Sequence, residues 1–454
     1  MYQTQNPFTQ IVEKKYRNFS DIKLRSILDD SYEAFHGWKL QNFQCRSSIL
    51  LKVAELLEER KNEYGRLITI EMGKPISQSV AEVEKCALVC RYYAANALDF
   101  LKSRRVESTA KMSQINYEPL GAVFAIMPWN FPFWQVFRFI APTLMAGNVG
   151  LLKHASNVPQ CAMAIAEVLK DAGVPNGVWN NLFITHKQVE FVIAHKYVKA
   201  VTLTGSNIAG SRVAELAGKY TKKTVLELGG SDPFIVFEDA DMNHTLEQAV
   251  LSRFLNAGQS CIAAKRFIVH QNIAKEFISR FKTLIENLSL GNPLDKETFV
   301  GPIVNLKALN ELQQQVDDSI NMGAVCITGG SKNSELENIF NPTLLINAPN
   351  NSPIWAEETF GPVAGLKTFD TDEEAVRLAN DTRFGLGASI WTQDMDRAMW
   401  ACKNINSGTV AVNGMVKSEP GLPFGGINES GYGRELGDYG IYEFVNIKTV
   451  SYFG

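Results

Sequence analysis

Features that would assign the chain to a macromolecular binding class are missing from its 454 residues. No apolar run reaches the ~18 residues that a membrane-spanning helix needs. The 45 basic and 48 acidic residues leave a net charge of −3, which favours neither nucleic acid nor an anionic membrane as a partner. Residues 1–7 lack the basic and then apolar segments of a secretion signal. We therefore expect a soluble, cytoplasmic protein that acts on small molecules.

A disulfide or metal framework is not predicted either. The seven cysteines are odd in number and scattered, as is usual in a reducing compartment. Only Cys86 and Cys90 lie near each other, at a spacing that fits one face of a helix. No His or Cys follows closely enough to complete a zinc site, so we expect both to be core residues and expect no metal.

The rest of the composition, 45% hydrophobic and 20% charged, predicts a large core divided over two or more domains. Before residue 114 the pattern is mainly helical, as in Leu50–Arg60. After it, β-prone runs alternate with helical stretches, at 122–126, 149–152, 198–203, 224–228, 233–237, 266–270 and 409–413. This rhythm is typical of βαβ units and predicts two α/β domains with parallel sheets, with a hinge at Gly229-Gly230.

The end of the chain, 448–454, reads as a β-strand without an obvious partner in its own domain. It could pair with the β-prone stretch 111–117 or with a sheet edge of another subunit. Because an uncovered strand edge favours association, we expect a homodimer or homotetramer.

The segment Asn256–Cys261 presents a cysteine among small, polar residues that suggest a flexible loop. With Lys265 and Arg266 close behind in sequence, the thiol could be both reachable and shifted toward ionisation. Taken alone, Cys261 could equally be a small buried residue.

Three further segments place polar groups at the ends of predicted strands. Asn130, between Pro128 and Pro132, is a candidate oxyanion donor, although a turn rich in proline would look the same. Thr204–Gly210 ends a strand and opens a helix, where backbone amides can hold phosphate, but it lacks the Gly-x-Gly-x-x-Gly pattern. Glu227 ends an apolar strand, and a buried carboxylate is costly unless it has a partner or a task.

The order and spacing of these segments resemble the aldehyde dehydrogenase superfamily from about residue 5 to the C-terminus. The segments that carry the resemblance are Pro-Trp-Asn-Phe-Pro at 128–132, Thr-Gly-Ser at 204–206, Glu-Leu-Gly-Gly at 227–230, Gly-Gln-Ser-Cys at 258–261, Glu-Thr-Phe-Gly-Pro at 358–362 and Pro-Phe-Gly-Gly at 423–426. The resemblance implies that Cys261 is the nucleophile, Glu227 the general base, and the Asn130 amide with the Cys261 backbone amide the oxyanion hole. It matches Glu435 to a position thought to relay protons.

The resemblance also implies an architecture. We expect a Rossmann-like cofactor-binding domain formed by 1–102 and 118–228, to which 420–436 return. A catalytic domain would span 229–419, and a small β oligomerisation element would comprise 103–117 and 437–454.

An NAD or NADP cofactor follows from the same resemblance. It would lie against Trp129, Lys153, Gly205, Ser206 and Gly210 at the adenosine and pyrophosphate end and against Leu228, Glu358 and Phe360 at the nicotinamide end. NAD-preferring relatives commonly have an acid three residues after the lysine, where this chain has Ser156. A neutral Ser156 does not repel a 2′-phosphate, so we expect NADP to be accepted.

The substrate would be read by side chains around Cys261. Trp134 and Arg138 share a helix face, and with Ser260 and Ser418 they suit a short aldehyde with a distal carboxylate. From spacing alone, Arg138 could instead form a surface ion pair. Segments 132–138 and 153–160 look like the short bacterial succinate-semialdehyde dehydrogenases, which implies succinic semialdehyde.

Other readings of the chain are an enzyme for another small polar aldehyde, such as glycolaldehyde or lactaldehyde, or a non-catalytic binding protein. The presence of Cys261, Glu227 and Asn130 argues against a non-catalytic protein. Glu227 also argues against a member that passes the thioester to coenzyme A.

Overall fold

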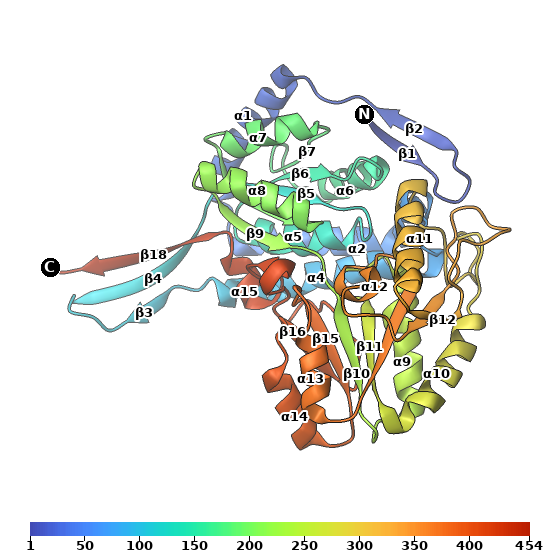
Figure 1. The fold of residues 1–454 in the computed structure, drawn as a ribbon. Helices are drawn as coiled ribbons and strands as arrows, with labels where there is room; N and C mark the ends of the chain where they lie inside the picture. The colour runs from blue at the N-terminus through green and yellow to red at the C-terminus, as the bar shows by residue number, and fades with distance from the viewer.

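Two large β-sheets dominate the fold (Figure 1). The computed structural model describes residues 1–454. The first sheet lies above the second in the view of Figure 1, and a narrow three-stranded sheet projects to one side. Both large sheets are mostly parallel, as the alternation of β-prone and helical segments predicts.

The first sheet has six strands in the order β17-β9-β8-β5-β6-β7. Their bounds are β5 Ala122–Met127, β6 Val149–His154, β7 Trp179–Asn181, β8 Val198–Thr204, β9 Lys223–Glu227 and β17 Gly431–Tyr432. The connecting helices are α5 Trp134–Met145, α6 Pro159–Asp171, α7 His186–Ala194 and α8 Asn207–Lys219. Only β17 is antiparallel, and it brings the segment after residue 430 beside β9.

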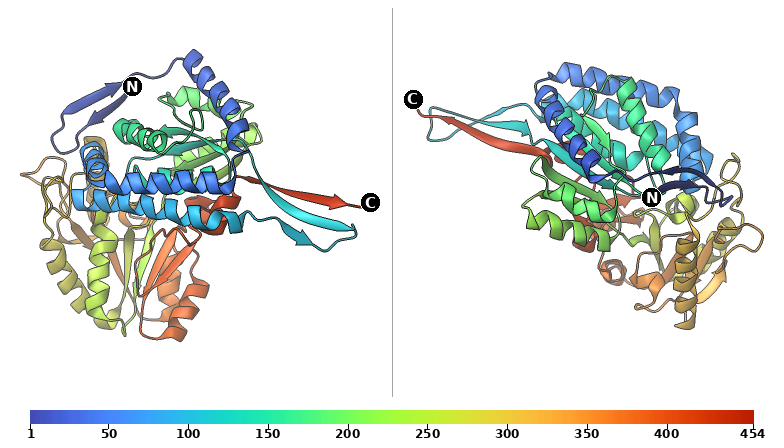
Figure 2. Two further views of the ribbon diagram at one scale, coloured as in Figure 1. Left: turned by 180° about the vertical axis from the view of Figure 1, so that it is seen from behind. Right: turned by 90° about the horizontal axis from the view of Figure 1, so that it is seen from above.

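Four helices precede this sheet, as the helical periodicity predicts: α1 Asp21–Trp38, α2 Phe43–Glu59, α3 Lys61–Met72 and α4 Ile76–Phe100. Seen from behind, α2 and α4 run side by side across the molecule (Figure 2). Cys86 and Cys90 are buried on α4. An N-terminal hairpin of β1 Tyr2–Gln5 and β2 Val12–Tyr16 was not predicted, because strands this short carry little periodicity. None of the helices combines the length and hydropathy needed to cross a bilayer.

The second sheet has seven strands in the order β12-β13-β14-β11-β10-β15-β16. Their bounds are β10 Asp232–Val236, β11 Ala264–His270, β12 Val325–Thr328, β13 Thr343–Ile346, β14 Val363–Phe369, β15 Gly387–Trp391 and β16 Thr409–Val412. Its helices are α9 Met242–Phe254, α10 Gln271–Glu286, α11 Leu306–Asn321, α12 Pro353–Ala356, α13 Asp372–Asn380 and α14 Met395–Asn404. Residues 228–231 connect β9, which follows α8 in the first sheet, to β10 in the second.

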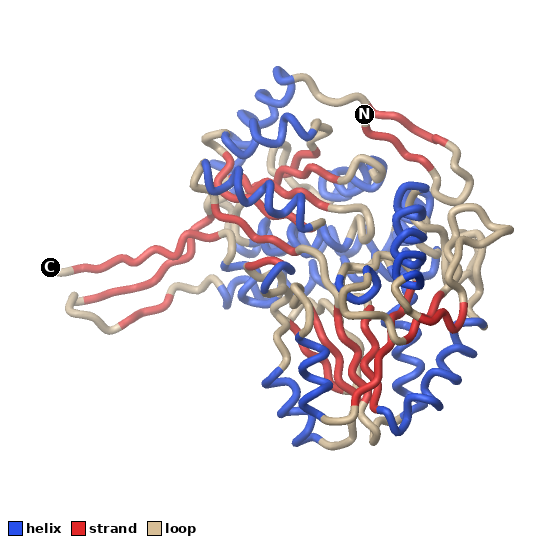
Figure 3. Tube along the Cα trace, in the orientation of Figure 1, coloured by secondary structure: helices blue, strands red, loops and turns tan.

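The projecting sheet, which we call the arm, has the order β18-β4-β3 and extends away from both large sheets (Figure 3). It consists of β3 Arg104–Val106, β4 Met112–Pro119 and β18 Val445–Tyr452. The predicted pairing of the C-terminal strand with the 111–117 stretch is present, with Val450 opposite Gln114. A short helix, α15 Gly437–Tyr442, precedes β18.

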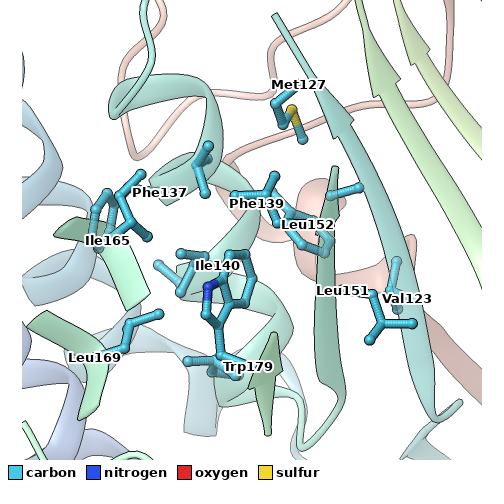
Figure 4. Packing of buried hydrophobic residues seen from close by; sticks show 14 of the residues in the cluster. Val123, Met127, Phe137, Phe139, Ile140, Leu151, Leu152, Ile165, Leu169 and Trp179 are labelled. Atoms are coloured by element: carbon cyan, nitrogen blue, oxygen red, sulfur yellow. The ribbon is translucent and has the colours of Figure 1, made fainter. Parts of the chain in front are cut away.

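The core of the six-stranded sheet fixes the helix α5, which begins just after the candidate oxyanion loop. Figure 4 shows Phe137, Phe139 and Ile140 of α5 packed among side chains of β5, β6, β7 and α6. Gly150 of β6 is required here, because a Cβ at that position would overlap the Trp179 ring. Close packing on all sides leaves α5 little freedom to move.

Candidate active site

The loop that carries Cys261 is rigid. It follows the 3-10 turn η1 Leu255–Gly258, in which Asn256, Ala257 and Gly258 have φ of 56°, 52° and 69°. The buried Arg253 guanidinium donates hydrogen bonds to the Gly258 and Gly361 carbonyl oxygens at 2.8 and 2.6 Å. Three consecutive left-handed residues held by a buried arginine contradict the expected flexible loop.

Asn130 lies against this loop and is oriented by it. Asn256 Nδ2 donates to the Asn130 carbonyl oxygen at 2.9 Å, and Asn130 Nδ2 donates to the Gln259 carbonyl oxygen at 2.9 Å. Gln135 Nε2 donates to Asn130 Oδ1 at 3.0 Å, which fixes the amide orientation. One Nδ2 hydrogen remains free, and the Cys261 backbone N–H has no acceptor in the protein. These two donors can bind an oxygen at Cys261.

The expected ionisation of the thiol is wrong for the ligand-free protein. Burial raises the pKa of Cys261 to about 12, and the charges of Arg138 and Lys265 oppose this only in part. The Lys265 ammonium donates to the Ser260 and Cys261 carbonyl oxygens at 2.9 and 2.7 Å. Arg266 donates to the carbonyl oxygens of Ser231, Leu378 and Ala379. Both cations thus face the backbone instead of the sulfur.

Cys261 stands between two cavities and lines both. The larger has a volume of about 770 Å³ and is lined by the predicted cofactor residues Trp129, Gly205, Ser206, Leu228, Glu358 and Phe360. The smaller has a volume of about 280 Å³ and is lined by the predicted substrate residues Trp134, Arg138, Ser260 and Ser418. The folded chain therefore gathers these residues into two groups that meet at one sulfur.

The larger cavity includes the start of α8. Ser206 caps this helix, and its Oγ accepts the Ala209 N–H at 3.3 Å. Gly210 does not line the cavity. Its role is in packing: it lets α8 approach Leu228, since a Cβ at position 210 would lie 2.5 Å from Leu228 Cδ2. At the Cys261 end, Glu358 Oε1 accepts the Gly230 N–H at 3.1 Å, and burial raises the pKa of Glu358.

Lys153 and Ser156 lie outside the larger cavity. Ser156 lines an adjacent cavity of about 400 Å³ together with Gln3 and Gln5 of the N-terminal strand. The two cavities share the lining residues Val304 and Asn305. The hairpin residues could not be found from sequence, since only the fold brings the N-terminus beside Ser156.

The Lys153 side chain has no carboxylate in contact. It is 7% exposed, and burial lowers its pKa to about 8. The Tyr2 ring centroid lies 5.9 Å from Lys153 Nζ. A buried ammonium without an acidic partner can bind an anion from outside the protein.

Glu227 lines neither cavity. Its carboxylate, 2% exposed, accepts no hydrogen bond and packs near Gly425, where a Cβ would come within 2.6 Å of Glu227 Oε1. Burial and the charge of Glu435 raise the pKa of Glu227 well above its usual range. The fold thus places Glu227 with Glu435 and Arg138, away from the lining around Cys261.

The Arg138 guanidinium already has partners within the protein. Its guanidinium contacts the buried Glu435 carboxylate, and its Nη2 donates to Thr204 Oγ1 at 3.2 Å. Burial raises the pKa of Glu435, and Arg138 opposes that shift. The alternative of a surface ion pair is wrong, because both partners are buried.

Sequence reasoning missed residues of α4 that line the smaller cavity. Lys85 Nζ donates to Ser418 Oγ at 3.1 Å and lies 4.0 Å from the Trp134 ring centroid. Lys74 pairs with Glu82, whose Oε1 also accepts the Phe133 and Trp134 N–H groups at 2.9 and 3.0 Å. Glu82 therefore caps α5, which has no capping side chain of its own. The available signal was the spacing of 78, 82 and 85 on one helical face.

Comparisons with known proteins identify the family of the chain. A profile of the aldehyde dehydrogenase family matches residues 1–450. The chain is 49% identical to a probable succinate-semialdehyde dehydrogenase [NADP(+)] of Synechocystis sp., over 98% of each chain. It is 43% identical to succinate-semialdehyde dehydrogenase [NADP(+)] 1 of Mycobacterium tuberculosis, again over 98% of each chain.

Solved structures show the same fold. The succinic semialdehyde dehydrogenase of Streptococcus pyogenes, solved in complex with NADP+, superimposes with a TM-score of 0.98 at 35% identity over 100% of both chains. A Burkholderia pseudomallei succinate-semialdehyde dehydrogenase gives a TM-score of 0.97 at 30% identity, covering 100% of this chain and 94% of the other. The predicted α/β fold is confirmed, and the chain belongs to the aldehyde dehydrogenase family.

Proposed function

We propose that the protein oxidises succinic semialdehyde to succinate with NADP as hydride acceptor, through a thioester on Cys261. The observation that carries this proposal is the pair of cavities meeting at Cys261, one dinucleotide-sized and one small and lined by cations. The names of the relatives in Synechocystis and Mycobacterium support the same substrate and cofactor.

The residues present fit a dinucleotide. The larger cavity ends on the start of α8, whose first N–H groups have no intrahelical acceptor and can hold a pyrophosphate. Gly205 contributes no side chain there, and Leu228, Glu358 and Phe360 line the end near Cys261. Lys153 would supply a charge for a 2′-phosphate, which the neutral Ser156 does not repel. When bound, NADP supplies the nicotinamide ring that accepts the hydride.

The protein groups have separate tasks in the reaction. The Cys261 sulfur, once deprotonated, adds to the aldehyde carbon, and the carbonyl oxygen becomes an alkoxide. Asn130 Nδ2 and the Cys261 N–H donate to that oxygen. As the C–O double bond re-forms, the carbon loses a hydride to the cofactor and remains bound to sulfur as a thioester. Water then adds to the thioester carbon, and breaking the C–S bond releases succinate and the thiolate.

Glu227 is the base that takes a proton from this water. Burial and the charge of Glu435 raise the pKa of Glu227, which increases the affinity of its carboxylate for that proton. Because Glu227 lines neither cavity, its side chain must turn toward Cys261 for this step. The release of Cys261 as the thiolate completes the cycle.

In the smaller cavity, Ser418 would face the distal carboxylate of the substrate, and Arg138, which lines the same cavity, would add its positive charge to the surroundings of that carboxylate. Trp134 holds Ser418, because its Nε1 donates to Ser418 Oγ at 2.9 Å. Ser260 lines the same cavity beside the sulfur. A small volume and buried positive charge together favour a short aldehyde that carries a carboxylate.

The proposal also covers the domain boundaries, the oligomeric state and the location of the protein in the cell. The cofactor-binding domain comprises 1–102 and 118–228 with 420–436, and the catalytic domain 229–419, a division that the membership of the two sheets supports. Residues 103–117 and 437–454 join subunits of a homodimer or homotetramer through the arm. Ile447 and Tyr452 of β18 are exposed there, as is Phe453 just after it. The seven free cysteines support a cytoplasmic location.

Steady-state kinetics on a panel of aldehydes with NADP and NAD test the proposal. Succinic semialdehyde with NADP should give the highest kcat/KM of the panel. A higher value for glycolaldehyde or lactaldehyde would replace the substrate but keep the reaction. If no aldehyde in the panel reduces either cofactor, the protein is not an aldehyde dehydrogenase in action, and the proposal fails.

A further inference from the structure

The charge state of the smaller cavity depends on which of its cations are already paired. Three cationic side chains line it, two of them from α4 and α5 and one from the connection that precedes α4. Lys74, in the connection between α3 and α4, pairs with Glu82, and Arg138 on α5 contacts Glu435. Lys85, one helical turn beyond Glu82, has no carboxylate in contact. The free positive charge of the cavity is therefore that of Lys85.

The surroundings of Lys85 hold its ammonium in place without neutralising it. Ser418 Oγ accepts a hydrogen bond from Lys85 Nζ at 3.1 Å and another from Trp134 Nε1 at 2.9 Å. The Trp134 ring centroid lies 4.0 Å from Nζ, which is a cation–π distance. A half-buried cation supported only by neutral groups stabilises an incoming carboxylate more strongly than one already paired.

We infer that Lys85 is the residue that selects a distal carboxylate, its ammonium binding that carboxylate together with Ser418 while Arg138 stays with Glu435. This inference rests on the proposed function and deepens it. Arg138 contributes positive potential to the cavity and positions Glu435. Lys85 then sets the KM for a carboxylate substrate and leaves the steps at Cys261 unchanged.

A pH dependence supports the test. Burial and the charge of Arg138 lower the pKa of Lys85 to about 8. The other charged or titratable groups around it are Glu82 and Cys86 on its own helix and Glu419 beside Ser418, and they oppose the shift. As pH rises past this value the free ammonium loses its proton, so the KM for a carboxylate substrate should rise, by about tenfold per pH unit at its steepest.

The experiment compares Lys85→Met with the wild type on succinic semialdehyde and on butanal, an uncharged aldehyde of the same chain length. We expect the kcat/KM for succinic semialdehyde to fall by about 10- to 100-fold through KM, with kcat held. The kcat/KM for butanal should rise, because an apolar chain no longer faces a buried charge. Lys275→Met, on an exposed face of α10, serves as the matched control.

A second variant separates charge from shape. Lys85→Arg keeps a charge at every accessible pH, so its KM for succinic semialdehyde should not rise between pH 7.5 and 9.5 where that of the wild type does. Thermal unfolding of each variant shows that the chain is folded. An unchanged KM in Lys85→Met, or a wild-type KM that does not vary with pH, overturns the role of Lys85. A wild type inactive on succinic semialdehyde overturns the proposed function instead.

Discussion

The two cavities that meet at Cys261 differ in both size and charge. The larger, of about 770 Å³, is lined by backbone at Gly205 and Gly229 and by acidic side chains such as Glu311 and Glu357. The smaller, of about 280 Å³, is lined by Lys74, Lys85 and Arg138. A large molecule can be held by shape and backbone donors, whereas a short one offers few contacts and must be recognised by charge.

Each cavity nevertheless has a lysine without an acidic partner in or near its lining. Lys85, half-buried in the smaller cavity, and Lys153, buried near the larger, have no carboxylate in contact, and burial is the main cause that lowers the pKa of each to about 8. A buried unpaired ammonium costs stability that an anionic ligand restores on binding. Each lysine can therefore recognise one anion, a carboxylate at Lys85 and a phosphate at Lys153.

A variant of Asn130 tests whether catalysis at Cys261 is independent of substrate recognition and of cofactor binding. Asn130→Ala removes one oxyanion donor, so we expect kcat to fall by about 100- to 1000-fold for every aldehyde and with either cofactor. The affinity for NADP, measured by titration calorimetry, should not change. Gln135→Leu, which removes the bond that orients the Asn130 amide, should cost less than Asn130→Ala. A loss confined to carboxylate substrates would instead place Asn130 within substrate recognition.

Ser156 tests the cofactor side alone. A carboxylate in Ser156→Glu would repel a 2′-phosphate and compete for Lys153, so kcat/KM for NADP should fall by about 10- to 100-fold, while that for NAD holds or rises. The preference for succinic semialdehyde over butanal should stay as in the wild type, because Ser156 lines only the cavity next to the N-terminal strand. Ser156→Ala is the neutral control. An equal loss with both cofactors would show that the serine does not face the 2′-phosphate.

Site residues in loops with a characteristic local motif could be predicted from the sequence. Site residues that reach the cavity only through the packing of a helix could not. Cys261 and Asn130 lie in loops rich in turn residues, where a short motif determines the local path of the chain. Lys85 and Glu82 lie on α4, whose periodicity shows an apolar face but not which polar side chains reach across it into a cavity.

The direction in which a side chain points was also not predictable from the sequence. Lys265 and Arg266 are near Cys261 in sequence, yet their hydrogen bonds turn them to backbone carbonyls. The Glu227 carboxylate lies near Gly425 because the segment after residue 420 returns to β9, a contact between residues about two hundred positions apart in sequence. Sequence near a residue does not fix the rotamer that such distant contacts select.

Arg138 gives the smallest expected effect and links the smaller cavity to the sulfur. Its charge opposes the burial that raises the pKa of Cys261, so Arg138→Met should raise that pKa further. Since only the thiolate reacts with iodoacetamide, the alkylation rate at a fixed pH below the pKa should fall by about 3- to 10-fold. In the wild type, the same rate should increase with pH across the neutral and alkaline range.

Arg138→Lys keeps the charge and should keep most of the wild-type rate. The reaction can be followed by mass spectrometry at Cys261 in the absence of substrate, so that the result does not depend on how the substrate carboxylate is bound. Because Lys85 is absent from the main influences on the pKa of Cys261, Lys85→Met should alkylate at the wild-type rate. A slower reaction in Lys85→Met than in Arg138→Met would reverse the assignment, since Lys85 would then act on the sulfur and Arg138 would be left to bind the carboxylate.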